Sequence, residues 1–368
     1  MAITKLVADS LGAGATPNQS AFKNIIINGD MSIAQRGTSI SGITGGNYYT
    51  VDRFRINILS MGTWTMSQET DVPSGQGFAN SLKMDCTTAD ASPSASDLLL
   101  LQTRFEGQNL QYLKKGTANA ESLTLSLWVK SNKTGTYIAE LYDEDNSRNI
   151  SKSYTINVAD TWEKKTITYA GDTTGTLDND NNRSLYLNLW LCAGTDYTSG
   201  TLQTTWGTQT TANKVVGQVN LADSTSNYIN ITGVQLEAGT TASDFEFLPY
   251  DVNLARCQRY FYKTSAVANM PYASGVANGT TNARGLITYP QIMRTSPSMS
   301  KSGSTNFNVY CGSTNVACTN VAFYYGNTQQ ILVYADVSSG LTNGQGALLI
   351  DNSGSSYITG DSELWYNQ

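Results

Sequence analysis

The chain lacks histidine altogether and carries little charge. None of its 368 residues is histidine, and charged residues make up 14%, against about a quarter in an ordinary soluble domain. A Ser-His-Asp triad, a Cys-His pair and histidine-ligated zinc or iron sites are therefore excluded. Carboxylate chemistry, calcium binding and recognition remain open.

Cysteines and long apolar runs are also scarce. The five cysteines are scattered and include no CxxC pair, so neither a zinc ribbon nor a disulfide framework is expected. We expect buried thiols, although Cys311 and Cys318 could pair across a hairpin in an oxidising compartment. No run approaches the roughly 18 apolar residues of a membrane span, and residues 1–7 lack the apolar core of a signal peptide.

The net charge of −6 comes without any Lys/Arg run. Surfaces that follow a phosphate backbone need clustered positive charge, so no nucleic-acid partner is expected. The same acidity argues against binding to anionic membranes, and no membrane insertion is expected.

The chain is instead rich in polar, turn-separated strand patterns. In 123–130 and 185–191, leucine or valine fills every second position and so shares one face of a strand. We expect strands at 24–28, 52–57, 64–69, 80–86, 122–131, 136–143, 152–157, 164–169, 184–192 and 226–237. After a short helix at 251–258, shorter strands follow at 259–264, 284–289, 306–310, 316–325, 329–336, 347–351 and 362–366.

These patterns predict an all-β chain in three parts. Residues 1–23 form a short extended N-terminal segment, which orders only against another molecule. Residues 24–250 form a jelly-roll β-sandwich, and residues 251–368 form a smaller C-terminal β-domain.

The non-leucine rows of the two leucine-rich strands combine aromatic and polar side chains. We call this set the aromatic platform; it consists of Ser126, Trp128, Lys130, Tyr186, Asn188 and Trp190. An aromatic plate with hydrogen-bonding edges suits a sugar ring, so these residues are carbohydrate-binding candidates. They could equally fill a second packing layer, under a loop or against a neighbouring subunit.

Other aromatic and acidic residues allow weaker predictions. Four tyrosines of the C-terminal domain are candidates for receptor contact or for a trimer interface: Tyr310, Tyr324, Tyr325 and Tyr334. Trp162, at a turn before a strand, is interpreted as a structural plug. Residues 143–145 read as a solvated acidic turn, and no pair of carboxylates stands out as catalytic, so no enzymatic activity is expected.

Several stretches carry a family resemblance: NIIINGDM at 24–31, SLTLSLWVKS at 122–131, ITGVQLEAG at 231–239 and PQIMRTSP at 290–297. Together with 35–38, 135–137, 161–168, 245–260 and 362–364, they resemble the carbohydrate-binding-module-like domain and the terminal domain of bacteriophage tail fibres and related minor virion proteins. The resemblance covers roughly residues 24–368.

The resemblance implies a structural virion protein, assembled in the cytoplasm of the bacterial host. It favours a homotrimeric tail fibre that adsorbs to a host cell-surface glycan and docks onto other virion proteins through residues 1–23. A head fibre, or a decoration or adaptor protein with a purely structural jelly roll, is the alternative, and a polysaccharide depolymerase is a third. Sandwich modules of this kind also suggest a structural calcium at Asn28, Asp30 and Glu237, with no other cofactor.

Overall fold

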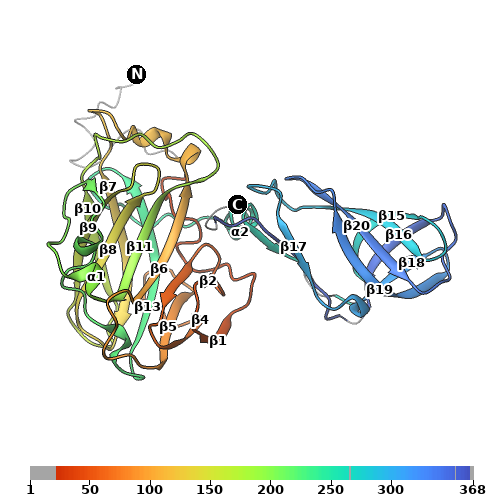
Figure 1. The fold of residues 1–368 in the computed structure, drawn as a ribbon, viewed down its shortest axis with the longest axis horizontal. Coiled ribbons are helices and arrows are strands. Elements are labelled where there is room, and N and C mark those ends of the chain that lie inside the picture. Colours follow the sequence, from red (N-terminus) through yellow and green to blue (C-terminus); the bar gives the residue numbers. More distant parts are fainter. Residues whose placement is uncertain (1–21, 265–266, 353, 365–368) are drawn as a thin grey trace, which may run out of the picture. The chain divides into compact units, whose positions relative to one another are not determined.

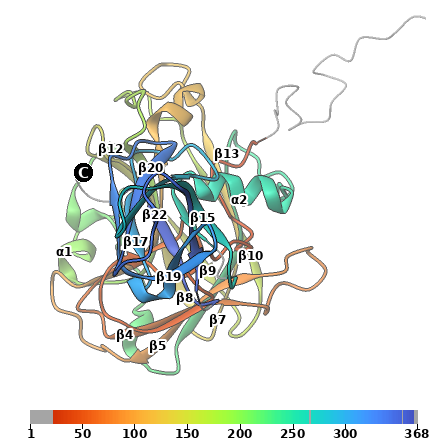
Figure 2. The ribbon, with the colours of Figure 1, turned by 90° about the vertical axis from the view of Figure 1, so that its right-hand side faces the viewer.

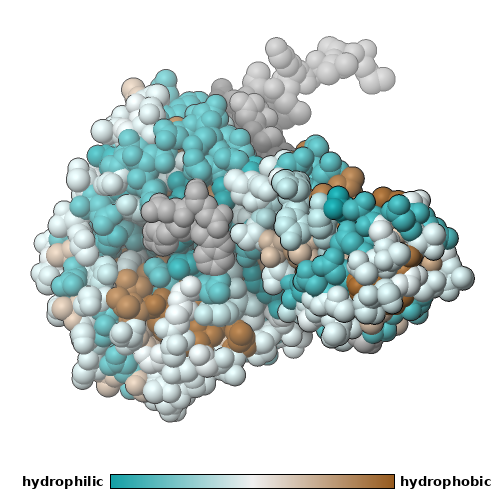
Figure 3. Space-filling view, turned by 45° about the vertical axis from the view of Figure 1, so that its right-hand side comes forward, coloured by the Kyte–Doolittle hydropathy of each residue, from teal (hydrophilic) through white to brown (hydrophobic). Residues whose placement is uncertain are grey.

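The computed structural model describes residues 22–264, 267–352 and 354–364. The chain divides into two compact units, Met1–Pro249 and Tyr250–Gln368 (Figure 1). Both are built of antiparallel strands, so the predicted all-β class is confirmed. Among the described residues, no helix has the length and apolarity needed to cross a bilayer. The face drawn in Figure 3 is mostly hydrophilic or of intermediate hydropathy, with a few hydrophobic patches.

The first unit is a jelly-roll sandwich of two sheets. The six-stranded sheet has the order β1 (Ser39–Ile43), β4 (Thr63–Glu69), β5 (Ser81–Thr88), β13 (Tyr228–Ala238), β7 (Leu123–Ser131) and β10 (Glu163–Tyr169). The seven-stranded sheet has the order β12 (Gly207–Thr208), β9 (Arg148–Ile156), β8 (Gly135–Asp143), β11 (Arg183–Ala193), β6 (Leu98–Glu106), β3 (Arg55–Leu59) and β2 (Asn47–Tyr48).

The loops of this unit carry only short helical turns. They are α1 (Thr195–Thr198) and the 3-10 turns η2 (Gly107–Asn109), η3 (Gln111–Leu113), η4 (Thr211–Asn213) and η5 (Leu221–Asp223). Because so little helix is present, the two sheets themselves enclose the core.

The leucine rows of β7 and β11 meet in this core. Leu125 and Leu127 of the first sheet and Leu187 and Leu189 of the second are all buried within one apolar cluster. Each such side chain contributes about 1.5–3 kcal/mol by leaving water. The alternation read from the sequence therefore identifies the inner faces of both sheets.

The second unit contains a helix, a small sheet and a barrel. Helix α2 (Tyr250–Gln258) leads into a three-stranded sheet of β14 (Phe261–Lys263), β22 (Ile358–Asp361) and β17 (Ser298–Lys301), with η6 (Ser304–Asn306) after β17. The closed barrel, coloured teal to blue in Figure 2, has the order β15 (Pro271–Ala277), β16 (Asn282–Thr288), β20 (Gln330–Val337), β19 (Thr314–Tyr324), β18 (Phe307–Cys311) and β21 (Gly346–Asp351).

Small side chains fill the barrel, because six strands leave a narrow interior. Ala273, Ala283, Ala335 and Ala347 all point into it and are buried. At Gly275 a Cβ atom would lie 1.8 Å from the carbonyl oxygen of Arg284, so no larger residue fits there.

Several sequence predictions of individual elements are wrong. Residues 24–28 form no strand; Asn28 and Met31 take positive φ values of 63° and 61°, which turn the backbone. Strand β6 was not predicted, because its Leu98–Leu101 run does not alternate, and β1, β2, β12, β15 and β17 were also missed. The last strand ends at Asp361, before the expected 362–366, of which 365–366 lie outside the described residues.

The prediction of buried thiols is confirmed. All five thiols are free and buried, as expected, and Cys311 and Cys318 form no disulfide. Burial raises the pKa of Cys318 to about 12, so it stays a neutral thiol near neutral pH.

The predicted docking segment, residues 1–23, lies outside the described residues except for Phe22 and Lys23.

Candidate functional site

The structure separates the aromatic platform into two halves. Trp128 lies on β7 of the six-stranded sheet, and Trp190 lies on β11 of the seven-stranded sheet. Since the leucines of both strands point into the shared core, the two tryptophan rows face away from it on opposite sides of the sandwich. The single platform expected from the sequence must therefore be corrected: these residues do not share a surface.

The Trp190 half is a packing layer. Trp190 is only 2% exposed, and Tyr186 and Asn188 are buried as well. Trp190 packs with Leu100, Ile138 and Val215, and Val215 lies in the loop after η4. A sugar cannot stack on a ring that is already covered. For this half of the aromatic platform, the interpretation as a second packing layer is therefore the one that holds.

A buried carboxylate organises the same layer. Glu140 Oε2 accepts hydrogen bonds from the Trp190 indole Nε1 at 2.9 Å and from Asn188 Nδ2 at 3.0 Å. Glu140 is buried, and Lys214 Nζ lies 3.8 Å from its other oxygen. The polar edges that suggested sugar contacts are thus used within the protein.

The Trp128 half is more open. Trp128 and Lys130 are half-buried, whereas Ser126 is buried. Asp71, from the β4–β5 loop, accepts from Lys130 Nζ at 2.5 Å and from the Trp162 indole Nε1 at 3.0 Å. Burial raises the pKa of Asp71, but these two hydrogen bonds outweigh it and lower the pKa. We call this surface the Trp128 face; it consists of Trp128, Lys130, Trp162 and Asp71.

The residues proposed for calcium have protein partners. Asn28 Nδ2 donates to the carbonyl oxygens of Ile33 and Asp52, and its Oδ1 accepts from the Ile33 amide. Glu237 accepts from the Ser243 amide at 2.8 Å and from Ser243 Oγ at 2.7 Å. Asp30 is half-buried, and no group of three or more Cys, Asp or Glu side chains in the described part of the chain could hold a metal. The calcium site stays a prediction that these contacts do not favour.

A pocket that the sequence did not indicate lies at one end of the sandwich. It is a shallow hollow of about 280 Å³, open solvent included, which we call the Trp206 pocket; it is lined by Leu113, Lys115, Glu121, Leu123, Ala170, Asp172, Leu185 and Trp206. Its floor is apolar, because all three leucines are buried in the core. Its walls come from the loops after η3 and β10 and from the residue before β12.

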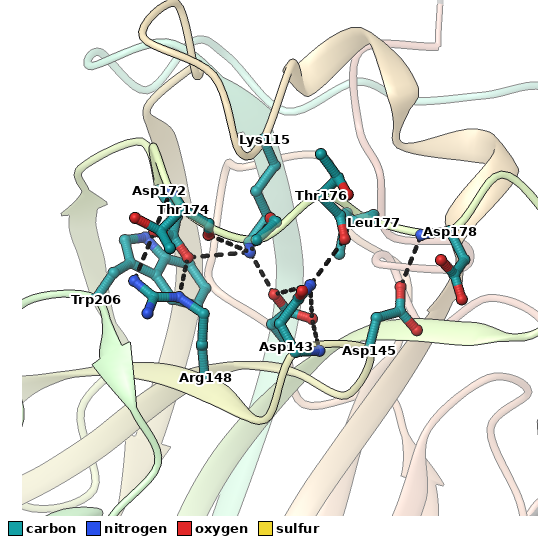
Figure 4. Close-up of polar contacts among 12 residues, drawn as sticks. Lys115, Asp143, Asp145, Arg148, Asp172, Thr174, Thr176, Leu177, Asp178 and Trp206 are labelled. Carbon is teal, nitrogen blue, oxygen red and sulfur yellow. Dashed lines mark hydrogen bonds and ion pairs between the residues drawn. The ribbon is translucent and has the colours of Figure 1, made fainter.

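Buried charges hold the pocket wall in place (Figure 4). Lys115 Nζ forms ion pairs with Asp143 and, at 3.0 Å, with Asp172 Oδ2. Arg148 binds the same Asp172 carboxylate through Nε at 2.8 Å and Nη2 at 2.9 Å. Such a bidentate pair fixes both partners in one orientation. The Asp143 side chain is fully buried, so the prediction of a solvated acidic turn is wrong for this residue.

The network also shifts pKa values. Burial raises the pKa of Asp172, but hydrogen bonds from Arg148 and Lys115 outweigh that effect and lower the pKa below its usual 3.8. The same hydrogen bond raises the pKa of Arg148. Asp172 is therefore ionised throughout the neutral range, and its oxygens are already occupied.

Trp206 and Glu121 are the groups available to a ligand. Trp206 is half-buried; its Nε1 donates to the Ala170 carbonyl at 2.7 Å, and Lys115 Nζ lies 5.1 Å from its ring centre. Glu121 Oε1 accepts from Lys114 Nζ at 2.7 Å, while its Oε2 makes no hydrogen bond with a described residue. No sequence signal links these residues, because distant loops bring them together.

The four tyrosines of the second unit do not form one group. Tyr324 lies 4.7 Å from Tyr334 and 6.2 Å from Tyr325, measured between ring centres. Tyr310 is on β18, opposite Asn315 and Leu348, away from the other three. Three of the four candidates thus cluster on the outer surface of the barrel.

Comparisons with known proteins give only remote likenesses. No protein-family model matches the chain, and no curated protein matches it either. Among solved structures, the enzymatically active domain of tailspike protein 4 from bacteriophage CBA120 is 14% identical with a TM-score of 0.32. That alignment covers 60% of this chain and 22% of the tailspike chain, so the chain spans about a fifth of that protein.

Two sugar-related structures have similar scores. A putative sugar-binding protein from Bacteroides thetaiotaomicron is 14% identical with a TM-score of 0.32, over 58% of this chain and 99% of that one. The module TmCBM61, solved with β-1,4-galactotriose, is 11% identical with a TM-score of 0.30, over 58% and 98%. At these values, the fold assignment depends on the strand order and packing described above.

Proposed function

We propose that the chain binds glycans through the Trp206 pocket and does so as a structural protein of a bacteriophage particle. The observation that carries the binding proposal is the half-buried Trp206 indole beside the open Glu121 oxygen, above an apolar floor. A sugar ring offers the complementary surfaces: C–H groups for the indole and hydroxyl donors for the carboxylate.

The size of the pocket suits a short ligand. The pocket is shallow, because its volume of about 280 Å³ includes space that is open to solvent, so a ligand would contact its mouth with one end and would not be enclosed. We therefore expect it to take a terminal sugar or a short branch. A single site of this kind binds with millimolar affinity, or about 4 kcal/mol, and several sites on one particle raise the avidity by about 10² to 10⁴.

The charges favour binding over hydrolysis. A glycosidase needs one carboxyl with a raised pKa to protonate the leaving group. In the pocket, Asp172 has a lowered pKa and both of its oxygens bond to Arg148. We propose a protein without enzymatic activity.

The virion assignment is supported by the family resemblance of residues 24–368 to phage fibre proteins. We propose a homotrimeric tail fibre that adsorbs to host-surface glycan, with residues 1–23 docking onto other virion proteins. Low charge suits this assembly, because faces around a threefold axis avoid unpaired charges.

A purely structural role is the second candidate, and a specific observation favours it. The Trp190 layer is covered by its own loop, so half of the aromatic surface serves packing. A head fibre or decoration protein would need nothing more from its sandwich.

The test is binding of the full chain to an array of bacterial surface oligosaccharides. Trp206→Ala should weaken binding about tenfold, from lost stacking and buried area, and Glu121→Gln should weaken it less while keeping the shape. Trp162→Ala is the matched control, since it also removes a half-buried indole that donates one hydrogen bond.

Each outcome decides between the candidates. Binding that survives Trp206→Ala but is lost in Trp162→Ala or Trp128→Ala would move the site to the Trp128 face. A folded trimer that binds no glycan would support the structural role. Reducing sugar released from host polysaccharide, and abolished by Glu121→Gln, would contradict the absence of enzymatic activity. Light scattering of the full chain tests the trimer, and immunogold labelling of particles distinguishes head from tail.

A further inference from the structure

A second surface with ligand-binding character lies on the outside of the barrel. The register pairs Arg284 of β16 with Tyr334 of β20, and Leu286 with Leu332, which in turn pairs with Tyr324 of β19. Figure 1 shows β16, β20 and β19 in the barrel. We call this surface the Tyr325 patch; it consists of Arg284, Leu286, Leu332, Tyr324, Tyr325 and Tyr334.

Tyr325 is presented to solvent in an unusual backbone conformation. Its side chain is 86% exposed, and its φ is +50°. A bulky residue in this left-handed region costs free energy, and such strain is concentrated at functional sites. A glycine or asparagine would adopt this φ value without strain. The backbone therefore does not require a tyrosine here, and we infer that the exposed ring itself has a role.

Arg284 supplies a positioned positive charge. Its guanidinium carbon lies 4.4 Å from the centre of the Tyr334 ring, and its Nε donates to Asn282 Oδ1 at 3.4 Å. With the Asn278 amide turned so that its oxygen faces Arg284, that oxygen lies 2.9 Å from Nη2. Neutral amides orient the guanidinium without neutralising it, and no carboxylate among the described residues forms an ion pair with it.

We propose that the Tyr325 patch binds an acidic sugar, with Arg284 pairing its carboxylate and the tyrosine rings stacking on the sugar ring. A guanidinium matches a carboxylate through two parallel hydrogen bonds. Tyrosine rings offer stacking area at low entropic cost. The inference rests on the proposal that the chain binds glycans, and it adds a second site and a sugar class.

A second copy of the chain is a less suitable occupant. It would have to bury Arg284 or supply a carboxylate to pair with it, since a buried unpaired charge is costly. The acidic residue in the adjacent row, Asp336, already accepts from Asn282 Nδ2 at 2.6 Å and from Asn320 Nδ2 at 3.0 Å. A free acidic sugar meets the charge without that cost.

The experiment uses the full chain and matched acidic and neutral probes. Sialyllactose is compared with lactose, and trigalacturonate with its carboxyl-reduced form, by calorimetric titration at low salt. We expect the acidic member of at least one pair to bind more tightly, by about tenfold. The difference should shrink at high salt, because the ion pair is exposed.

Variants locate the binding. Arg284→Gln should remove the preference for the acidic member. Arg284→Lys should keep part of it, because lysine retains the positive charge but cannot form two parallel hydrogen bonds to a carboxylate. Tyr325→Ala should weaken both members of the pair. Tyr310→Ala is the control, because it removes another exposed tyrosine ring of the same barrel that lies outside the patch.

The results separate this inference from the proposed function. Glycan binding that is lost in Trp206→Ala but unchanged in Arg284→Gln and Tyr325→Ala would overturn the patch alone. The absence of any glycan binding would count against both. Dissociation of the assembly by Tyr325→Ala, measured by light scattering, would identify the patch as a subunit interface and overturn the inference.

Discussion

Strands β7 and β11 have almost the same sequence pattern, yet their outer faces differ. Each places leucines in the core and a tryptophan on the other side. On β11, Val215 from the loop after η4 packs on Trp190, and a buried carboxylate accepts a hydrogen bond from its indole. On β7, Trp128 stays half-buried beside an exposed ion pair. The comparison teaches that alternation specifies the inner face of a strand and leaves the outer face to the loops.

The largest expected effect comes from truncating the two tryptophans. Trp190→Ala should lower the free energy of unfolding by about 3–5 kcal/mol, because it leaves a cavity in a closed layer. Trp128→Ala should cost clearly less, since its ring already contacts water. Urea unfolding followed by circular dichroism measures both. Equal losses would show that the two faces are equally covered.

The next comparison uses two carboxylates that each accept an indole hydrogen bond. Glu140→Ala leaves the buried donors of Trp190 and Asn188 unpaired, at a cost of about 1–3 kcal/mol. Asp71→Ala removes a partner of Trp162 and Lys130 at the surface, at a cost of at most about 1 kcal/mol. Chemical unfolding of both variants at neutral pH gives the difference, and a larger loss in Asp71→Ala would reverse this ranking.

The smallest expected effect is a difference in acid sensitivity. The folded-state pKa of Asp172 and of Asp71 is lowered, so each stabilises the fold above the unfolded-state pKa near 3.8 and loses that effect as pH falls through the folded value. The Asp172 side chain is 2% exposed and that of Asp71 is 48% exposed, so Asp172 should contribute more.

Unfolding curves between neutral pH and acid check this. The free energy of unfolding should fall less with decreasing pH in Asp172→Asn than in Asp71→Asn. If Asp172→Asn lost as much unfolding free energy on acidification as the unmodified chain, the role assigned to the buried network would be contradicted.

Local pattern was enough to predict most strands and α2, because alternation and turn residues act over a few positions. It failed where the cause is not local. The run in β6 does not alternate because both of its faces are covered, and residues 24–28 turn instead of extending. At the candidate site, Asp143 looked like part of a solvated turn, and only the approach of Lys115 from a distant loop shows why it is buried.

The sequence by itself determined the all-β class, the inner faces of the sandwich, the buried thiols and the exclusion of histidine chemistry, because these depend on composition and on period-two patterning. Only the tertiary structure decided which aromatic rings remain available. The Trp206 pocket and the Tyr325 patch each join residues from separate strands and loops, and their chemistry arises from register and loop packing, which no single segment encodes.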